Sequence, residues 1–303
     1  MRMRRAGVTM SEVTMNHTEQ LRQAALEHVR QGDLDDAIAL YDEALALVAD
    51  EEARELITIN KADAMIALER SGPEVQELAR IIMRRRNLRH VYLAAYALQY
   101  KHRLENDFKR ALFYGQLALR TADEAGEAAW RRIVLIDLGN VYEMDSQIDQ
   151  AIECFEQALE ISGESNANHD QDLSHGYALE NLGYCMLLQQ RIDEGIETIT
   201  RALSILRDPI GAAEAHIDLC YGYLEQNDLV QALEHGTAGL DLAKDPRQIR
   251  NSHYLLGEVA YKLGDVDKAD FHFEQLARFY PEFRSLKSLL FAIDLRGMVN
   301  LKL

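Results

Sequence analysis

The sequence of 303 residues predicts an all-α fold built from repeated helix hairpins. Only four prolines occur, and this depletion favours long helices because a proline inside a helix costs about 3 kcal/mol. Apolar residues make up 48% and charged residues 27% of the chain, which is too hydrophobic for wholesale disorder and too charged for a bundle of membrane helices. A pattern of small residues also recurs along the chain in one register, which is typical of stacked helix pairs.

The recurring pattern places a small residue just after a short polar turn, an aromatic or small residue four positions later and another small residue three positions after that. The six anchors of the pattern are Ala37, Ala111, Ala151, Gly195, Ala232 and Ala269. Twelve residues before the anchors lies a second, mostly small set: Ala25, Gln99, Gly139, Gly183, Cys220 and Gly257. Small side chains at both places allow two antiparallel helices to cross closely. The first two anchors are 74 residues apart, so a seventh, degenerate copy is expected over residues 54–88.

The best copy reads Leu138-Gly139-Asn140-Val141-Tyr142, followed by Ala151, Phe155 and Ala158. These residues resemble the tetratricopeptide repeat, whose pattern is Leu-Gly-x-x-Tyr, then Ala-x-x-x-Phe-x-x-Ala, then Pro. The resemblance implies a right-handed superhelical solenoid of about seven helix pairs plus a C-terminal capping helix. The anchors lie 37 to 44 residues apart, which makes these repeats longer than the standard period of about 34 residues.

The repeat register divides the chain into a disordered N-terminal extension over residues 1–16, a repeat array over 17–281 and a C-terminal capping helix with its tail over 282–303. One apolar stripe of the capping helix is expected to seal the last repeat, and it consists of Phe283, Leu286, Leu290 and Ile293. The other apolar residues of this end leave two alternatives: the end folds back on the array, or the protein self-associates through its C-terminal helix.

The charge and the cysteines restrict the kind of partner and the compartment. A net charge of −17 opposes binding to nucleic acid or to anionic lipid. No apolar run is long enough to span a bilayer and no secretory signal is recognisable, so we expect no membrane partner. The three cysteines, Cys154, Cys185 and Cys220, are too few and too scattered for a disulfide framework and predict reduced thiols in the cytoplasm.

Motifs that carry catalytic chemistry are missing from the sequence. It contains no glycine-rich phosphate loop, no Gly-x-Ser-x-Gly, no His-Glu-x-x-His and no Cys-x-x-Cys. We therefore predict no enzymatic activity, no cofactor and no metal. His169 and His175 flank a polar stretch that also holds two aspartates, and a polar linker is a simpler interpretation than a metal site. His216 and His253 are 37 residues apart in equivalent places, which favours a structural role at the start of the first helix of each pair.

The family resemblance implies that the first helix of each pair lines a concave groove and supplies the ligand contacts. Carried over to this chain, the expected binding residues of the groove are Tyr96, Tyr100, Arg103, Asn140, Glu143, Tyr184, Tyr221, Tyr254 and Glu258. The tyrosines either present a rigid ring with a polar tip to a peptide or pack between helices. Four acids of the inner face predict a basic or mixed-charge ligand, and they are Glu143, Glu180, Asp218 and Glu258.

The segment over residues 80–132 has the opposite charge, with twelve Lys and Arg against five acids. Its local cluster consists of Arg84, Arg85, Arg86 and Arg89. The cluster is either a docking patch for an acidic partner or a phosphate group, or a solvated face whose arginines pair with acids of the same chain.

These observations predict a non-catalytic cytoplasmic scaffold or adaptor that binds a partner protein or peptide in its groove. Two other functions remain open. One is a peptide-responsive bacterial regulator that resembles the Rap-type phosphatase and quorum-sensing receptors. The other is an enzyme with a site buried in the array, which would need a nucleophile and a base that converge.

Overall fold

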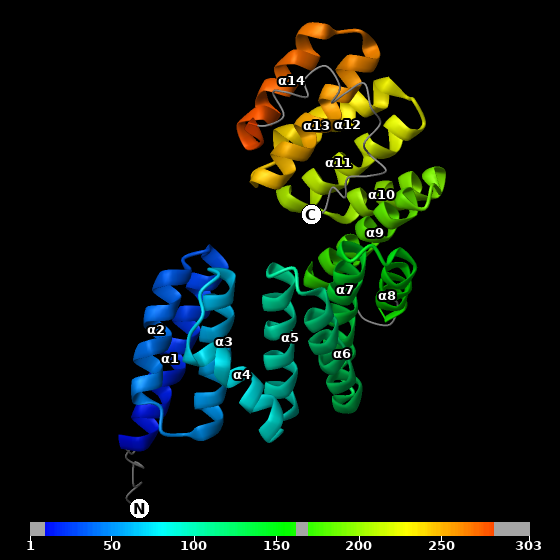
Figure 1. The fold of residues 1–303 in the computed structure, drawn as a ribbon. Helices are drawn as coiled ribbons and strands as arrows, with labels where there is room; N and C mark the ends of the chain where they lie inside the picture. The colour runs from blue at the N-terminus through cyan, green and yellow to red at the C-terminus, as the bar shows by residue number, and fades with distance from the viewer. Residues whose placement is uncertain (1–9, 162–168, 282–303) are drawn as a thin grey trace, which may run out of the picture. The chain divides into compact units, whose positions relative to one another are not determined.

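The computed structural model describes residues 10–161 and 169–281, except for the side chains of 10–16 and 169–172. The described residues form fourteen α-helices and no strand, which confirms the predicted all-α class (Figure 1). The chain divides into two compact units, residues 1–134 and residues 135–303. The helices that lie wholly in the first unit are α1 Met10–Gln31, α2 Leu34–Leu47, α3 Glu51–Ala67, α4 Pro73–Arg84, α5 Leu88–Leu104 and α6 Phe108–Ala125.

Helix α7, Ala128–Met144, crosses from the first unit into the second. The remaining helices are α8 Ile148–Ile161, α9 His169–Leu188, α10 Ile192–Ile205, α11 Pro209–Glu225, α12 Leu229–Leu242, α13 Pro246–Leu263 and α14 Val266–Phe279. Each odd-numbered helix is joined to the next helix by two to five residues, and the two form a hairpin. Pro73, Pro209 and Pro246 each occupy the first position of a helix, where the missing N–H costs nothing.

Each hairpin closes through the same left-handed turn. One residue with φ between 54° and 84° ends every odd-numbered helix, and the set is Gly32, Glu69, Asn106, Ser146, Gln190, Asn227 and Gly264. Its N–H donates to the carbonyl three residues before, and the next N–H donates to the carbonyl five residues before, at 2.8–3.1 Å in all seven turns. This closure satisfies carbonyl groups that the helix end would otherwise leave without donors.

The spacing of these turn residues gives the length of each repeat. They are separated by 37, 37, 40, 44, 37 and 37 residues, which are the intervals expected from the small-residue anchors. Glu69 lies midway between Gly32 and Asn106, so the degenerate copy expected between the first two anchors is a hairpin like the others. The longer intervals reflect added residues and not a change of turn.

Small residues lie where the two helices of a hairpin touch. A methyl group on Gly139 would come within 2.5 Å of the ring of Phe155 in the next helix. A methyl group on Gly183 would lie 3.0 Å from the carbonyl oxygen of Gly195 and 2.5 Å from the side chain of Ile199. In these hairpins the backbone of one helix packs directly against side chains of the other helix, which explains the recurring small residues.

The ends of the array differ from the sequence prediction at one point. Helix α1 begins at Met10, so residues 10–16 belong to a helix and the prediction of a disordered extension over 1–16 is wrong for them. No proline or glycine interrupts this stretch, and the helix continues upstream of the repeat register. Residues 1–9 and the predicted capping helix over 282–303 lie outside the described residues.

Two histidine pairs join the helices of two consecutive hairpins. His216 of α11 faces His235 of α12, and His253 of α13 faces His272 of α14, with 2.9 Å between the Nδ1 atoms in both pairs. The ring centroids lie 5.1 and 5.2 Å apart, so the two Nδ1 atoms lie close to the line that joins the ring centres. Such a head-on contact is an N–H···N hydrogen bond that holds one proton. The predicted structural role of His216 and His253 fits this contact, although both lie in mid-helix and not at its start.

Burial lowers the pKa of all four histidines. Positive neighbours lower it further in the second pair, where Arg278 acts on His253, and His253 and Lys268 act on His272. The pKa of His272 falls to about 4. In the first pair the ring of His235 also lowers the pKa of His216, while Glu234 opposes the shift in both residues.

The turn geometry gives a first prediction. Gln190 is exposed and has a φ of 63°, a conformation that costs an L-residue about 1–2 kcal/mol and costs glycine little. We expect Gln190→Gly to raise the free energy of unfolding by about 0.5–1 kcal/mol in urea titrations. The control Glu197→Gly, in the interior of α10, should lower it by about 1 kcal/mol. A loss of stability in both variants would contradict the turn assignment.

The histidine pairs give a second prediction. Their folded-state pKa values lie below the unfolded value of about 6.5, so the unfolded chain binds more protons in acid. The stabilisation is complete above pH 6.5 and is lost as the pH falls toward 4. Between pH 7 and 4.5 the free energy of unfolding should fall by roughly 2 kcal/mol more in the wild type than in His253→Gln/His272→Gln. Urea unfolding at each pH measures the difference, and the exposed-site control His17→Gln should keep the wild-type profile.

Candidate functional site

The arginine cluster of the first unit is exposed and mostly paired within the chain. Arg84 bonds to Glu77 at 2.7 Å, Arg85 pairs with Glu124, and Arg86 pairs with Glu51. Arg89 is exposed and makes no ion pair with the residues that the structure describes. Exposed pairs of this kind contribute about 0–1 kcal/mol each, so they leave the arginines able to exchange partners. A docking role for Arg84, Arg85, Arg86 and Arg89 stays a prediction.

The predicted groove residues of the first unit lie on α5 and are partly exposed. Tyr96, Tyr100 and Arg103 each keep some accessible surface. The guanidinium carbon of Arg103 lies 5.2 Å from the ring centroid of Tyr100, which is a cation–π contact. These three side chains are therefore partly accessible, and their role in binding remains a prediction.

The predicted groove residues of the second unit are mostly buried. Tyr184 and Tyr221 have 0% and 1% of their surface exposed and belong to the apolar core cluster, with ring centroids 6.2 Å apart. Tyr254 belongs to the same cluster. In this structure these three rings therefore pack in the core and do not face solvent. Their part in binding stays a prediction.

Asn140, Glu143 and Glu258 complete the predicted set. Asn140 is partly exposed, and its Oδ1 atom accepts no hydrogen bond from the described part of the chain. Glu143 and Glu258 are buried. The Nζ atom of Lys262, one helical turn further on, lies 3.7 Å from a carboxylate oxygen of Glu258.

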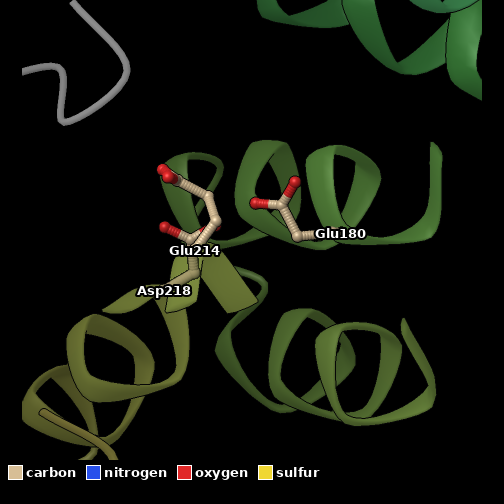
Figure 2. Close-up of side chains that lie close together, drawn as sticks. All are labelled: Glu180, Glu214 and Asp218. Atoms are coloured by element: carbon tan, nitrogen blue, oxygen red, sulfur yellow. The ribbon is translucent and has the colours of Figure 1, made fainter. Parts of the chain in front are cut away.

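Two helices of the second unit bring three buried carboxylates together (Figure 2). Glu180 comes from α9, while Glu214 and Asp218 lie one turn apart on α11, and one oxygen of each lies within 4.8 Å of the others. Their exposed fractions are 2%, 7% and 0%. We call Glu180, Glu214 and Asp218 the acidic cluster. The sequence indicated Glu180 and Asp218 as inner acids, whereas nothing in it singled out Glu214.

A cation and an amide from α13 hold one member of the cluster. Arg247 donates to both oxygens of Glu214 at 2.8 Å, and Gln248 donates to one of them at 2.9 Å. Burial acts to lower the pKa of Arg247, but the hydrogen bonds and the charge of Glu214 outweigh it and raise the pKa well above its usual value. The fork of a guanidinium matches a carboxylate, so the site already shows the kind of group that this cluster accepts.

A tyrosine and a helix cap border the cluster. Tyr177 donates from its hydroxyl to Asp208 at 2.9 Å, and the same oxygen of Asp208 accepts from the N–H of Gly211 at the start of α11. Burial, this hydrogen bond and the charges of Asp208, Glu180 and Glu214 all raise the pKa of Tyr177. The phenol of Tyr177 therefore stays protonated and donates its hydrogen to Asp208.

The acidic cluster and the tyrosine pair lie on one face. Tyr184 follows Glu180 by four residues on α9, and Tyr221 follows Asp218 by three residues on α11, which are spacings that place side chains on one side of a helix. We call this set of buried side chains the acidic face of α9 and α11. It combines carboxylates with adjacent aromatic rings, a combination suited to a cationic side chain that also carries apolar surface.

Three carboxylate oxygens could also ligate a hard divalent cation. Arg247 already binds both oxygens of Glu214, which leaves that residue a poor metal ligand. The arrangement therefore fits a guanidinium or ammonium group better than a metal ion. The cysteines fit no nucleophilic role either, because burial and the nearby Glu153 raise the pKa of the Cys154 thiol to about 12, and Cys185 and Cys220 are fully buried.

Comparisons with known proteins agree with this architecture. Family models for the tetratricopeptide repeat match residues 22–57, 134–165 and 252–282. The chain is a tetratricopeptide repeat (TPR) protein. The predicted family and solenoid fold class are thus confirmed. None of the helices described in this TPR protein combines the length and apolar content that a membrane crossing needs.

Among curated proteins the chain is similar to photosystem I assembly protein Ycf3 of Synechococcus elongatus, at 28% identity over 93 residues. The match covers 29% of this chain and 54% of the relative, so the chain spans about half the length of the curated relatives it matches. Among solved structures, the apo form of RapI has a TM-score of 0.68 at 13% identity, over 94% of this chain and 84% of that one. NprR in complex with its cognate peptide NprX has a TM-score of 0.62 at 16% identity, over 93% and 84%. At these identities the likeness shows the fold alone.

The pairing of Arg247 with Glu214 gives a third prediction. Removing Arg247 takes the bidentate cation away from the buried carboxylate of Glu214, so Arg247→Met should lower the free energy of unfolding by about 3 kcal/mol. The double variant Glu214→Met/Arg247→Met should recover much of that loss. The matched control Arg191→Met breaks an exposed pair with Glu194 and should cost less than about 1 kcal/mol. Urea unfolding measures all three, and equal losses for Arg247→Met and Arg191→Met would contradict a buried ionic contact.

Proposed function

We propose that this TPR protein is a non-catalytic scaffold or adaptor, which binds a partner protein or peptide through the inner face of its first helices. The observation that carries the proposal is the acidic face of α9 and α11, where Glu180, Glu214 and Asp218 gather, with Tyr184 and Tyr221 one helical turn further along the same helices. A ligand for such a face is a basic or mixed-charge segment with apolar side chains. The binding residues predicted from the sequence form part of this proposal.

The comparisons support a protein-interaction role at the level of fold. TPR proteins are in general non-catalytic interaction modules, and the NprR structure contains a bound peptide. The three free cysteines and the net charge of −17 support a cytoplasmic protein with no nucleic-acid partner. The exposed arginines around Arg89 are a second proposed contact surface, suited to an acidic partner.

A second candidate function is a peptide-responsive bacterial regulator of the Rap type. The likeness to RapI, with a TM-score of 0.68 over 94% of the chain, favours keeping it as an alternative. Release of phosphate from a phosphorylated response regulator in the presence of the protein would support this function. A scaffold would leave the phosphoryl group in place.

The proposal predicts selective binding of basic peptides. A set of fluorescent peptides that alternate Arg or Lys with aliphatic residues should bind with micromolar Kd, which corresponds to about 8 kcal/mol, while the matched Glu set should not bind. Glu180→Gln/Asp218→Asn should weaken the basic set by roughly tenfold or more, because it removes two charges from the acidic cluster. Fluorescence anisotropy measures each Kd.

Two further variants sharpen this test. Tyr184→Phe/Tyr221→Phe keeps the buried rings and removes their hydroxyls, so a severalfold loss of affinity with an unchanged circular dichroism spectrum is expected. The control Glu197→Gln/Asp241→Asn removes the same charge from exposed positions and should bind like the wild type. Equal binding of basic and acidic peptides would remove the assignment of the site.

A further inference from the structure

We propose that the arginines along one edge of the first unit bind an acidic segment of a partner protein that also carries an apolar side chain. We call this surface the arginine edge, and it consists of Arg84, Arg85, Arg86, Arg89, Arg120 and Arg131. The inference deepens the second contact surface of the proposed function and rests on it. It does not involve the acidic face of α9 and α11.

The arginine edge joins four helix ends. It includes the end of α4, the start of α5, the end of α6 and the start of α7. Arg85, which directly follows α4, pairs with Glu124 in the last turn of α6. Arg131, in the first turn of α7, lies 3.1 Å from Asp123 near the end of α6. These two ion pairs show that the four helix ends lie next to one another.

Positive charge exceeds negative charge at this edge. Residues 84–89 and 120–131 together contain six arginines and three acids. Arg89 and Arg120 are exposed, and neither forms an ion pair within the part of the chain that the structure describes. The pairs of Arg85 with Glu124 and of Arg86 with Glu51 are open to water and therefore weak. An incoming carboxylate can thus bind the unpaired arginines and replace the acids at the paired ones.

The side chains of the edge indicate the chemistry of the partner. Its cations are all arginines, whose planar guanidinium donates two parallel hydrogen bonds to one carboxylate. Arg84 already donates to a carboxylate oxygen of Glu77 at 2.7 Å. Met83, next to Arg84, has 84% of its surface exposed, and methionine adapts its shape to apolar groups of a ligand. A segment with several carboxylates and an apolar side chain matches both features.

The charge of the rest of the chain favours a short acidic segment over an extended polyanion. Residues 80–132 carry a charge of +7, so the other residues of a chain with net charge −17 carry −24. DNA or an anionic bilayer would extend beyond the edge and would be repelled by that charge. A short segment contacts the arginines alone.

A peptide titration tests the proposal on the full-length protein. A short fluorescent peptide that combines Asp and Glu with one leucine should bind with roughly micromolar Kd at low salt and more weakly as salt rises. Arg89→Gln/Arg120→Gln should weaken it about tenfold, and this variant breaks no ion pair of the described residues. The control Lys109→Gln/Arg110→Gln removes the same charge at the other end of α6, about 20 Å away, and should bind like the wild type. The only tryptophan, Trp130 of α7, reports binding independently through its fluorescence.

A second variant should increase the affinity, a result that a damaged fold does not produce. Glu51→Gln/Glu124→Gln removes the carboxylates that now pair with Arg86 and Arg85, so the acidic peptide should bind severalfold more tightly. The control Glu197→Gln/Asp241→Asn removes the same charge from the second unit and should leave Kd unchanged. Equal Kd values for the wild type, Arg89→Gln/Arg120→Gln and Glu51→Gln/Glu124→Gln would overturn the proposal.

Other occupants of the edge give different results. Tighter binding of a DNA duplex or of anionic vesicles, lost in Arg89→Gln/Arg120→Gln, would overturn a protein segment as the partner. Oligomers in light scattering that the same variant dissociates would overturn it in favour of a second copy of the chain. No binding of the acidic peptide, with binding of basic peptides intact, would remove the arginine edge alone. Binding of neither kind of peptide would remove the scaffold function as well.

Discussion

The left-handed turn at the end of each odd-numbered helix is the constraint on which the rest of the structure depends. Its two hydrogen bonds, to the carbonyls three and five residues before, end one helix and position the next within a few residues. A hairpin closed in this way keeps its two helices in a fixed register, so small residues such as Gly183 and Gly195 meet face to face. Neither feature is sufficient alone, because a correct turn with bulky residues at the crossing would force the helices apart.

Charge is distributed in two different ways within the two units. In the first unit the arginines at the end of α4 and just after it are exposed and exchangeable, since their ion pairs form in water. In the second unit carboxylates are buried on the first helices, where every charge needs a specific partner. The exposed set is suited to weak and salt-sensitive contacts, whereas the buried set is suited to selecting one kind of cationic group.

The hairpins could be predicted from the sequence because the residue patterns that indicate them are local. Small residues, polar turns and prolines at helix starts lie within one repeat, and even the degenerate copy keeps its turn at Glu69. The candidate site was harder to predict from the sequence because it depends on contacts between repeats. Glu214 and Arg247 are 33 residues apart, a separation that is not a multiple of the repeat and leaves no periodic signal. The burial of Tyr184 and Tyr221 likewise depends on the neighbouring helices and not on their own position in the pattern.

The twin histidine contacts show that two adjacent hairpins are near-copies in chemistry as well as in length. His216 and His253 are 37 residues apart, and so are His235 and His272. Excision of 37 residues between His216 and His272 would therefore bring those two side chains into the same relation that each now has with its own partner. The repeats are therefore equivalent down to individual side chains. The array can lose one repeat of 37 residues here and still keep a matched histidine contact between the helices that become neighbours.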